Sequence, residues 1–435
     1  MPNLPAPVRL LVVAVFAALL TTSCVGDPSG GSDGDAGSVG STPDPTSTGA
    51  PEPPSNDPLP WGPTEAELAK AQETVRSMSP AELAGQVIVG RWHGTEPATA
   101  AAMVADLHLA GVQLTGDNIV DRAQVSATTA AVAEAFERSG RSFPPVIGVD
   151  QEGGAVAHLS GISAEFPPFA TSGAIVAQDG RAGRRTVRAA MRAMAFELRE
   201  LGFTWVFAPV ADVTIGDADV TIGSRSPSSD PKVAARAVRA AVEGYGDAGL
   251  VSTTKHFPGH GAATADSHET LPEIEVSREQ LESRELPPFR AAVQAGAPAV
   301  MIGHLGVSSL APGVPTSLAP EAYDLLRDDL GFEGVAITDS LGMGAVLTPG
   351  RRPAVEALAA GADLLLMPAN TPETHGVVTR ALKSGELDRE RVEEAAARVV
   401  AVQLWQQRTS RERNVPDDAS ARAAAAAQDL LDASY

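Results

Sequence analysis

The chain has 435 residues, and its 54 Asp and Glu against 33 Lys and Arg give a formal net charge of −21 at neutral pH. This excess of acidic residues argues against contact with a phosphate backbone, so we expect no nucleic-acid partner. The sequence contains a single cysteine, so no disulfide can form within the chain and the fold must depend on its hydrophobic core.

The first residues are typical of a secretion signal. Leu10 to Leu20 form an apolar run of eleven positions preceded by Arg9, which is too short to span a bilayer comfortably. We therefore interpret residues 1–23 as a signal peptide. The segment Leu20-Thr-Thr-Ser-Cys24 resembles the lipid-attachment box of bacterial lipoproteins, which implies a lipid on Cys24 and accounts for the unpaired cysteine. An ordinary cleaved signal or an uncleaved anchor is the alternative.

A segment rich in Gly, Ser, Pro and Asp comes next. Residues 25–60 contain no Lys, Arg or aromatic residue, so they cannot bury enough apolar surface to fold. Residues 24–60 are therefore predicted to be a disordered tether with an end-to-end distance of roughly 35 Å. We expect an exported protein, held by this tether at the outer face of the cytoplasmic membrane or secreted. The remaining domain, residues 61–435, carries 48 acidic against 32 basic residues, which favours solubility.

Short apolar runs alternate with amphipathic segments from about residue 80 onward. Runs of this length between turn residues are typical of strands buried on both faces. The predicted strands are residues 86–90, 111–115, 145–149, 205–209, 250–254, 297–302, 334–338 and 362–367. The predicted helices include residues 184–201, 232–245, 277–295, 387–407 and 419–431.

This alternation predicts an α/β fold, a (β/α)8 TIM-type barrel that forms a single catalytic domain with no second domain. An open, doubly wound sheet is the structural alternative. It is disfavoured because no Gly-x-Gly-x-x-Gly motif follows an early strand.

Titratable residues stand where several predicted strands end. Asp150 ends the third run, Lys255 and His256 end the fifth, His304 ends the sixth and Asp339 ends the seventh. Active sites of such barrels lie at the C-terminal ends of the strands, so we expect these side chains to meet at one rim.

The densest group of such residues is Lys255-His-Phe-Pro-Gly-His-Gly261, followed by Asp266-Ser-His268. The spacing of its three histidines across a Pro- and Gly-containing loop does not match a helix-borne zinc motif, so no metal is expected. His260 is equally well explained as a structural residue.

Two of the strand-end residues permit more than one interpretation. Lys255 could form a Schiff base, but a neighbouring anion such as Asp150 would keep it protonated as a hydrogen-bond donor. Asp339 could cap the next helix, or it could serve as a rigidly held nucleophile.

Together these motifs resemble glycoside hydrolase family 3. The resemblance rests on the Lys255–His268 stretch, on Gly148-Val-Asp-Gln-Glu-Gly-Gly154 and on Asp339 after the seventh strand. It covers about residues 80–405 and points to the single-domain β-N-acetylhexosaminidases of that family.

The resemblance implies a retaining mechanism with Asp339 as the nucleophile. It also implies His268 as the general acid/base, oriented by Asp266. A histidine can serve this purpose because an unperturbed imidazole titrates near ~6.5 and so exchanges protons near neutral pH.

The sugar hydroxyls are then expected to be held by Asp150, Arg225, Lys255 and His256, since charge-assisted hydrogen bonds are strong and directional. Ala155 and His158 stand where the family often has arginines, which puts the preference for the leaving group in doubt.

The function that the resemblance implies is an exo-acting β-N-acetylhexosaminidase. We expect it to remove terminal β-linked N-acetylglucosamine from cell-wall-derived glycans or muropeptides, without a cofactor and as a monomer. A β-glucosidase or glycoside phosphorylase of the same family is an alternative. A non-catalytic lipoprotein that binds wall sugars and a Schiff-base lyase centred on Lys255 are others.

Overall fold

The computed structural model describes residues 54–219, 221–263 and 265–434. The predicted signal peptide, Cys24 and nearly all of the predicted tether lie outside the described residues. Within the described part, no helix is both long enough and apolar enough to cross a bilayer.

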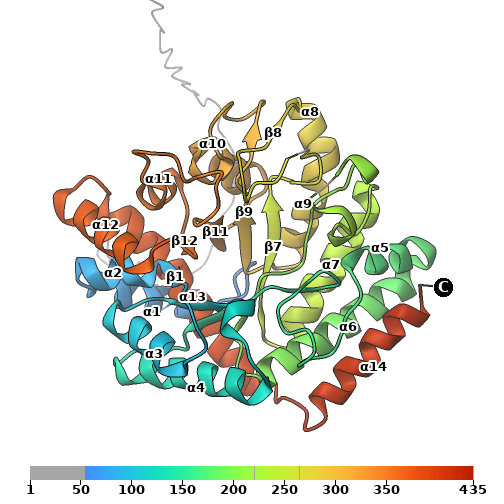
Figure 1. The fold of residues 1–435 in the computed structure, drawn as a ribbon, viewed down its shortest axis with the longest axis horizontal. Coiled ribbons are helices and arrows are strands. Elements are labelled where there is room, and N and C mark those ends of the chain that lie inside the picture. The colour runs from blue at the N-terminus through green and yellow to red at the C-terminus, as the bar shows by residue number, and fades with distance from the viewer. Residues whose placement is uncertain (1–53, 220, 264, 435) are drawn as a thin grey trace, which may run out of the picture. The chain divides into compact units, whose positions relative to one another are not determined.

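A closed barrel of eight parallel strands lies at the centre of the described residues (Figure 1). Its strands, in the order in which they pair, are β1 (Ile88–Gly90), β12 (Leu364–Leu366), β11 (Val335–Ser340), β9 (Ala299–Ile302), β7 (Val251–Phe257), β6 (Trp205–Val206), β3 (Val146–Val149) and β2 (Gly111–Leu114). All eight predicted strands are present, and the predicted (β/α)8 barrel is confirmed.

The ring is closed by pairing between its first and last strands. Ile88 of β1 lies opposite Leu365 of β12, and Val89 lies opposite Leu366. The predicted strand 205–209 is shorter than expected, because the regular pairing of β6 ends at Val206. Pro209, three residues later, has no amide hydrogen to donate to a neighbouring strand.

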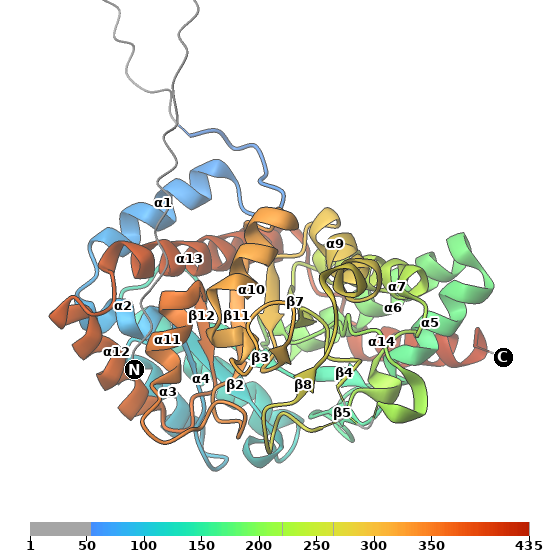
Figure 2. The same ribbon diagram turned by 90° about the horizontal axis from the view of Figure 1, so that it is seen from above.

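Helices surround the barrel on its outer side (Figures 1 and 2). They are α1 (Glu65–Arg76), α2 (Pro80–Gln86), α3 (Pro97–Asp106), α4 (Arg122–Arg138), α5 (Phe169–Gln178), α6 (Gly180–Glu200), α7 (Pro231–Asp247), α8 (Arg278–Gln280), α9 (Leu286–Gln294), α10 (Pro320–Asp324), α11 (Pro353–Ala360), α12 (Thr371–Ser384), α13 (Arg389–Glu412) and α14 (Ala419–Asp432). The C-terminal helix α14 packs beside α6 in both views.

The predicted helix 277–295 is interrupted. A short α8 is followed by a π-helical turn, Leu281–Glu285, and only then by α9. Pro287 and Pro288 lack the amide hydrogens that a regular helix would need at these positions, so the hydrogen-bond register changes just before them.

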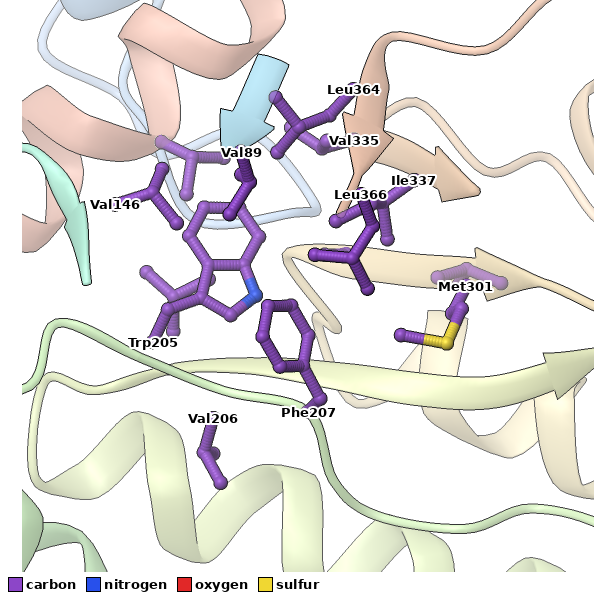
Figure 3. Packing of buried hydrophobic residues seen from close by; sticks show 14 of the residues in the cluster. Val89, Val146, Trp205, Val206, Phe207, Met301, Val335, Ile337, Leu364 and Leu366 are labelled. Atoms are coloured by element: carbon purple, nitrogen blue, oxygen red, sulfur yellow. The ribbon is translucent and has the colours of Figure 1, made fainter. Parts of the chain in front are cut away.

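The interior of the barrel is filled by large apolar side chains (Figure 3). Trp205 and Phe207 are fully buried there, and the indole Nε1 of Trp205 donates a hydrogen bond to Thr253 Oγ1 at 2.5 Å. Gly148 makes room for the Phe207 ring, since a Cβ atom at this position would lie 2.5 Å from it. This packed layer forms a solid floor, so ligands can be held only in the loops at the ends of the strands.

Two small sheets lie among the loops that follow the strands. One is the antiparallel hairpin of β4 (Gln151–Gly153) and β5 (Val156–Ala157), which directly follows β3. The other pairs β8 (Glu273–Ile274) with β10 (Gly306–Val307) in parallel.

Candidate active site

A cavity of about 370 Å³ opens at the C-terminal ends of the barrel strands. Small-molecule sites typically measure roughly 300–1,000 Å³, so this cavity has room for a sugar. Six of the predicted site residues line it, namely Asp150, Arg225, Lys255, His256, His268 and Asp339. They come from β7, β11 and the loops after β3, β6 and β7, so the barrel brings together residues that are far apart in the sequence.

Asp339 lies near the end of β11, on the wall of the cavity, and is half-buried. Its Oδ1 accepts a hydrogen bond from the amide of Ser340 at 2.7 Å, while Oδ2 has no protein partner among the described residues. Burial by itself would raise the pKa of Asp339. Interactions with the His256 and His304 rings, the hydrogen bond from the Ser340 amide and the charge of Lys255 outweigh burial and lower the pKa to about 2. The carboxylate is therefore ionised at neutral pH with one oxygen available for attack.

His304 does not join the other residues in the cavity, contrary to the prediction from its place at the end of the sixth strand. Its ring is fully buried, with Nε2 donating to the carbonyl oxygen of Ser340 at 2.9 Å and Nδ1 accepting from Ser317 Oγ at 2.6 Å. Burial lowers the pKa of His304, which favours the neutral ring. The hydrogen bond from His304 to Ser340 fixes the backbone next to Asp339.

Lys255 lies at the centre of a buried ionic network. Its Nζ binds Asp150 Oδ1 and lies 2.6 Å from Glu152 Oε1. Glu152 in turn accepts two hydrogen bonds from Arg225, at 2.8 Å from Nε and 2.9 Å from Nη2. Gln113 Nε2 donates to the second oxygen of Asp150. Every charge in the network is thus matched by an opposite one.

This pairing determines the ionisation of the network. Burial favours the neutral form of Lys255, but Asp150 and Glu152 outweigh it and raise the pKa of the ammonium group. Likewise, Lys255 and Arg225 outweigh burial at Glu152 and lower its pKa to about 2. Lys255 therefore stays protonated, which disfavours a Schiff-base function and leaves it as a rigid hydrogen-bond donor.

His256 is held by a second buried carboxylate, Asp212. Nδ1 of His256 donates to Asp212 Oδ2 at 2.8 Å, and Oδ1 accepts from the backbone amides of His256 at 3.1 Å and His260 at 2.7 Å. Burial opposes the charge on Asp212, but its pKa is lowered by His256, His260 and these hydrogen bonds. The pairing leaves Nε2 of His256 directed at Arg225, 3.4 Å from Nη2.

Lys255 and His256 are adjacent in β7, yet both line the cavity. In a regular strand they would point to opposite faces. The pairing of β7 with β9 is irregular between Thr254 and Phe257. Such an irregularity redirects side chains, and here it accompanies the presentation of two successive polar groups to one cavity.

His268 and Asp266 form a pair on the loop at the mouth of the cavity. Nδ1 of His268 donates to Asp266 Oδ1 at 2.8 Å, and the same oxygen accepts from the His268 amide at 2.9 Å. Their side chains are 68% and 48% exposed, so the imidazole is open to solvent as well as to the cavity. The hydrogen bonds from His268 lower the pKa of Asp266. Since Nδ1 carries the proton that Asp266 accepts, Nε2 is the nitrogen available to a substrate.

The loop that carries this pair is joined to the loop that follows Asp339. The amide of Gly344 donates to the carbonyl oxygen of His268 at 2.9 Å, and that of Ala345 donates to Ser267 at 3.3 Å. Nε2 of His260 also contacts Ser267 Oγ at 3.1 Å. The two segments that hold the predicted nucleophile and acid/base are therefore directly connected through backbone hydrogen bonds.

Glu152 and Asp212 are site residues that the sequence analysis missed. Glu152 stands in the Gly148–Gly154 motif, two residues after Asp150. The motif indicates that Glu152 lies near the rim, but it does not indicate which residues Glu152 binds. Asp212 lies beyond the end of the fourth predicted strand, where a carboxylate is expected to point at the same rim.

The two departures from the family motif lie in the β4–β5 hairpin region. Ala155 is exposed at the turn, and His158 is half-buried and lines the cavity. Among the residues that the structure describes, no group of three or more His, Cys, Asp or Glu side chains is arranged to hold a metal ion.

This geometry suits group transfer at a polyhydroxylated substrate. It combines an ionised carboxylate on the cavity wall, a solvent-accessible imidazole oriented by a carboxylate, and a set of fully paired charges that can bind hydroxyl groups.

Comparison with known proteins agrees with this description. Residues 81–402 match the family described as "Glycosyl hydrolase family 3 N terminal domain". The chain is 37% identical over 285 residues to a β-hexosaminidase of Stenotrophomonas maltophilia (strain R551-3), a match that covers 64% of this chain and 83% of that protein.

Solved structures show the same fold. A family 3 β-N-acetylglucosaminidase from Paenibacillus sp. str. FPU-7 superposes with a TM-score of 0.74 at 29% identity, covering 82% of this chain and 69% of that one. A fungal multi-domain family 3 β-N-acetylglucosaminidase gives a TM-score of 0.74 at 30% identity; 81% of this chain but only 43% of that longer chain is covered. From its barrel, its motifs and these relatives, the chain belongs to glycoside hydrolase family 3 and is a glycoside hydrolase.

Proposed function

We propose that this protein is an exo-acting, retaining β-N-acetylhexosaminidase that removes terminal β-linked N-acetylglucosamine from cell-wall-type glycans. The observation that carries the proposal is the arrangement of Asp339 and His268 around one cavity. Asp339 has a lowered pKa and a free oxygen, and His268 is exposed at the mouth with its orientation set by Asp266. The β-hexosaminidase and β-N-acetylglucosaminidase relatives support the choice of sugar.

The proposed reaction has two steps. Asp339 attacks the anomeric carbon while His268 gives its Nε2 proton to the leaving oxygen, which yields a covalent glycosyl-enzyme and the free leaving group. His268 then takes a proton from water, which attacks the anomeric carbon and releases Asp339. Lys255, Asp150, Arg225 and the residues paired with them hold the sugar hydroxyls throughout.

A mechanism-based label tests the proposed nucleophile. Incubation with a 5-fluoro N-acetylglucosaminyl fluoride should attach one sugar to the peptide that contains Asp339, as read by mass spectrometry. Asp339→Asn should not be labelled. The anomer released first from an aryl β-N-acetylglucosaminide, followed by NMR, should be β. First release of the α-anomer would refute a retaining mechanism.

The same assay separates the related activities. We expect hydrolysis of aryl β-N-acetylglucosaminide to exceed hydrolysis of aryl β-glucoside. If phosphate replaced water, glycosyl phosphate would accumulate in phosphate buffer, and the protein would be a phosphorylase.

We also propose that the protein is exported and anchored by a lipid on Cys24. The support is the apolar run Leu10–Leu20 and the lone cysteine that follows it. Metabolic labelling with a radioactive fatty acid should mark the wild-type protein in a bacterial host that makes lipoproteins. Loss of the label in Cys24→Ala supports the anchor, and an unlabelled wild type refutes it.

A further inference from the structure

Ser267 is buried between two exposed residues of the acid/base loop, the loop that carries Asp266 and His268. The side chains of Asp266 and His268 are 48% and 68% exposed, whereas Ser267 as a whole is 2% exposed. Among the described residues, the Ser267 hydroxyl makes one hydrogen bond, to Nε2 of His260 at 3.1 Å. The bond attaches the acid/base loop to the rest of the site through a buried side chain.

His260, the other partner in this bond, is held by the part of the site that is proposed to bind the sugar. Its amide donates to Asp212 Oδ1 at 2.7 Å, and the same carboxylate accepts from Nδ1 of His256 at 2.8 Å. The ring of His260 packs edge-on against the ring of His256, with the two centroids 5.7 Å apart. His260 is 2% exposed, so its neighbours leave the ring little freedom to move.

The imidazole of His260 is suited to this contact because it is neutral. Burial lowers the pKa of His260, helped by His256 and opposed by Asp212. A neutral imidazole carries one N–H, so Nε2 either donates to the Ser267 hydroxyl or accepts from it, and either tautomer makes the bond. Since Nδ1 of His260 has no hydrogen-bond partner among the described residues, Ser267 is the one side-chain partner of this ring within them.

The acid/base loop is thereby attached to the site on two sides. On one side, the carbonyl oxygens of Ser267 and His268 accept from the amides of Ala345 at 3.3 Å and Gly344 at 2.9 Å, in the segment after Asp339. On the other side, the bond from Ser267 to His260 reaches the segment that follows β7. Two attachments restrict the loop more than one, and proton transfer requires the donor and acceptor to lie within hydrogen-bond reach.

We propose that His260 is a positioning residue that holds the acid/base loop against the sugar-binding side of the cavity through Ser267. The inference rests on the proposed function and adds to it a residue that determines where His268 meets the glycosidic oxygen. Without this bond the buried hydroxyl of Ser267 has no partner, so the loop favours positions in which that hydroxyl reaches water. In those positions His268 is displaced from the place where it transfers the proton.

The test compares a leaving group that needs a proton with one that does not. Wild type, His260→Phe and Ser267→Ala are assayed on phenyl and on 2,4-dinitrophenyl β-N-acetylglucosaminide, because phenolate needs help from an acid to leave and dinitrophenolate does not. His260→Phe keeps a ring against His256 but removes the hydrogen bond. Ser267→Ala removes the same bond with little change in volume. His375→Gln is the matched control, because His375 lies outside the cavity, where its Nε2 donates to the carbonyl oxygen of Ala81.

Both variants should lose about tenfold in kcat/KM on the phenyl glycoside, the value of one buried hydrogen bond, and less than about twofold on the dinitrophenyl glycoside. The double variant should lose no more than either single variant, because both substitutions remove the same bond. His260→Gln, whose amide can still donate to Ser267, should keep part of the activity, and His375→Gln should keep all of it. Azide attacks without help from a base, so it should raise kcat of His260→Phe and Ser267→Ala on the dinitrophenyl glycoside and yield the β-glycosyl azide.

Amide hydrogen exchange tests the attachment without reference to activity. The peptide that contains Ser267 and His268 should exchange faster in His260→Phe and in Ser267→Ala than in wild type or His375→Gln, with circular dichroism unchanged. Ser267→Ala alone is sufficient for this comparison if His260→Phe does not fold.

The inference is overturned if exchange in this peptide is unchanged, if the losses are equal on the two glycosides, or if the losses of the single variants multiply in the double variant. These results leave the proposed function intact as long as wild type hydrolyses the aryl β-N-acetylglucosaminides. Absence of turnover by wild type on every N-acetylglucosaminide refutes the proposed function, and the exchange measurement still decides whether His260 holds the loop.

Discussion

Glu285 gives a quantitative test of how a loop of the candidate active site is supported. Its carboxylate is buried at the end of the π-helical turn and packs on Gly259, where a Cβ atom would lie 2.6 Å from Glu285 Oε2. Neither oxygen has a hydrogen-bond partner of good geometry among the described residues, although Arg284 Nη1 lies 2.8 Å from Oε1. Burial raises the pKa of Glu285 to about 7, helped by Asp212 and Asp219 and opposed by Arg284.

The raised pKa makes the free energy of unfolding depend on pH. Below pH 4.5, the ordinary pKa, Glu285 holds its proton in both the folded and the unfolded chain, so ionisation costs nothing. As the pH rises toward 7, the unfolded chain ionises first and stability falls. Above pH 7 the free energy of unfolding stays lower by the full cost of ionising the buried Glu285. A pKa shift from 4.5 to about 7 corresponds to about 3 kcal/mol.

Glu285→Gln removes the ionisable group and keeps the shape of the side chain. Thermal unfolding of the variant should match that of the wild type near pH 4.5 and exceed it at pH 8 by about 4 °C, from the entropy of unfolding of a domain of this size. Glu282→Gln is the control, because Glu282 lies on the same turn but is exposed and paired with Arg278. A difference between Glu285→Gln and wild type that stays constant with pH, or a less stable variant at pH 8, would contradict the reasoning.

Three further substitutions test the site and the barrel floor. Asp339→Asn should lower kcat on aryl β-N-acetylglucosaminide by roughly 10⁴-fold while circular dichroism stays unchanged, since it removes the proposed nucleophile but little volume; residual activity near the wild-type value would remove Asp339 from the mechanism. Asp266→Asn should lower kcat about tenfold to hundredfold and alter the pH–rate profile, because the carboxylate that orients His268 is lost; an unchanged profile would show that the pair does not act together. Gly148→Ala should cost about 1–3 kcal/mol in urea unfolding, because its Cβ meets the Phe207 ring; unchanged stability would show that the ring can move aside.

The barrel could be predicted because each strand has its own local signal. A buried parallel strand is a short apolar run between turn residues, and every such run in residues 86–367 became a strand. The same logic placed Asp150 and Asp339 at one rim, since all strands of the barrel point the same way. The interruption of the helix before α9 was not predicted, although Pro287 and Pro288 in the sequence indicate a break in a regular helix.

The partners of the site residues could not be predicted in the same way. Glu152 matters because Arg225, 73 positions later, and Lys255 both reach it. Asp212 matters because it binds His256, 44 positions later. His304 shows the opposite error, since its position at a strand end is like that of Asp339 but its ring is fully buried and does not line the cavity. Which way a side chain turns depends on packing between distant segments, and periodicity carries no information about it.

The pairing of Ile88 with Leu365 also constrains when the protein can fold. The two residues are separated by more than half of the chain, so the barrel cannot close until the ribosome has made β12. Until then β1 and β11 each have an unpaired edge, and such edges promote aggregation. Contacts of such long sequence separation also make folding slow. If the protein is exported as proposed, this delay is useful, because the nascent chain reaches the membrane before its native fold can block passage. Final closure of the barrel then takes place outside the cytoplasm.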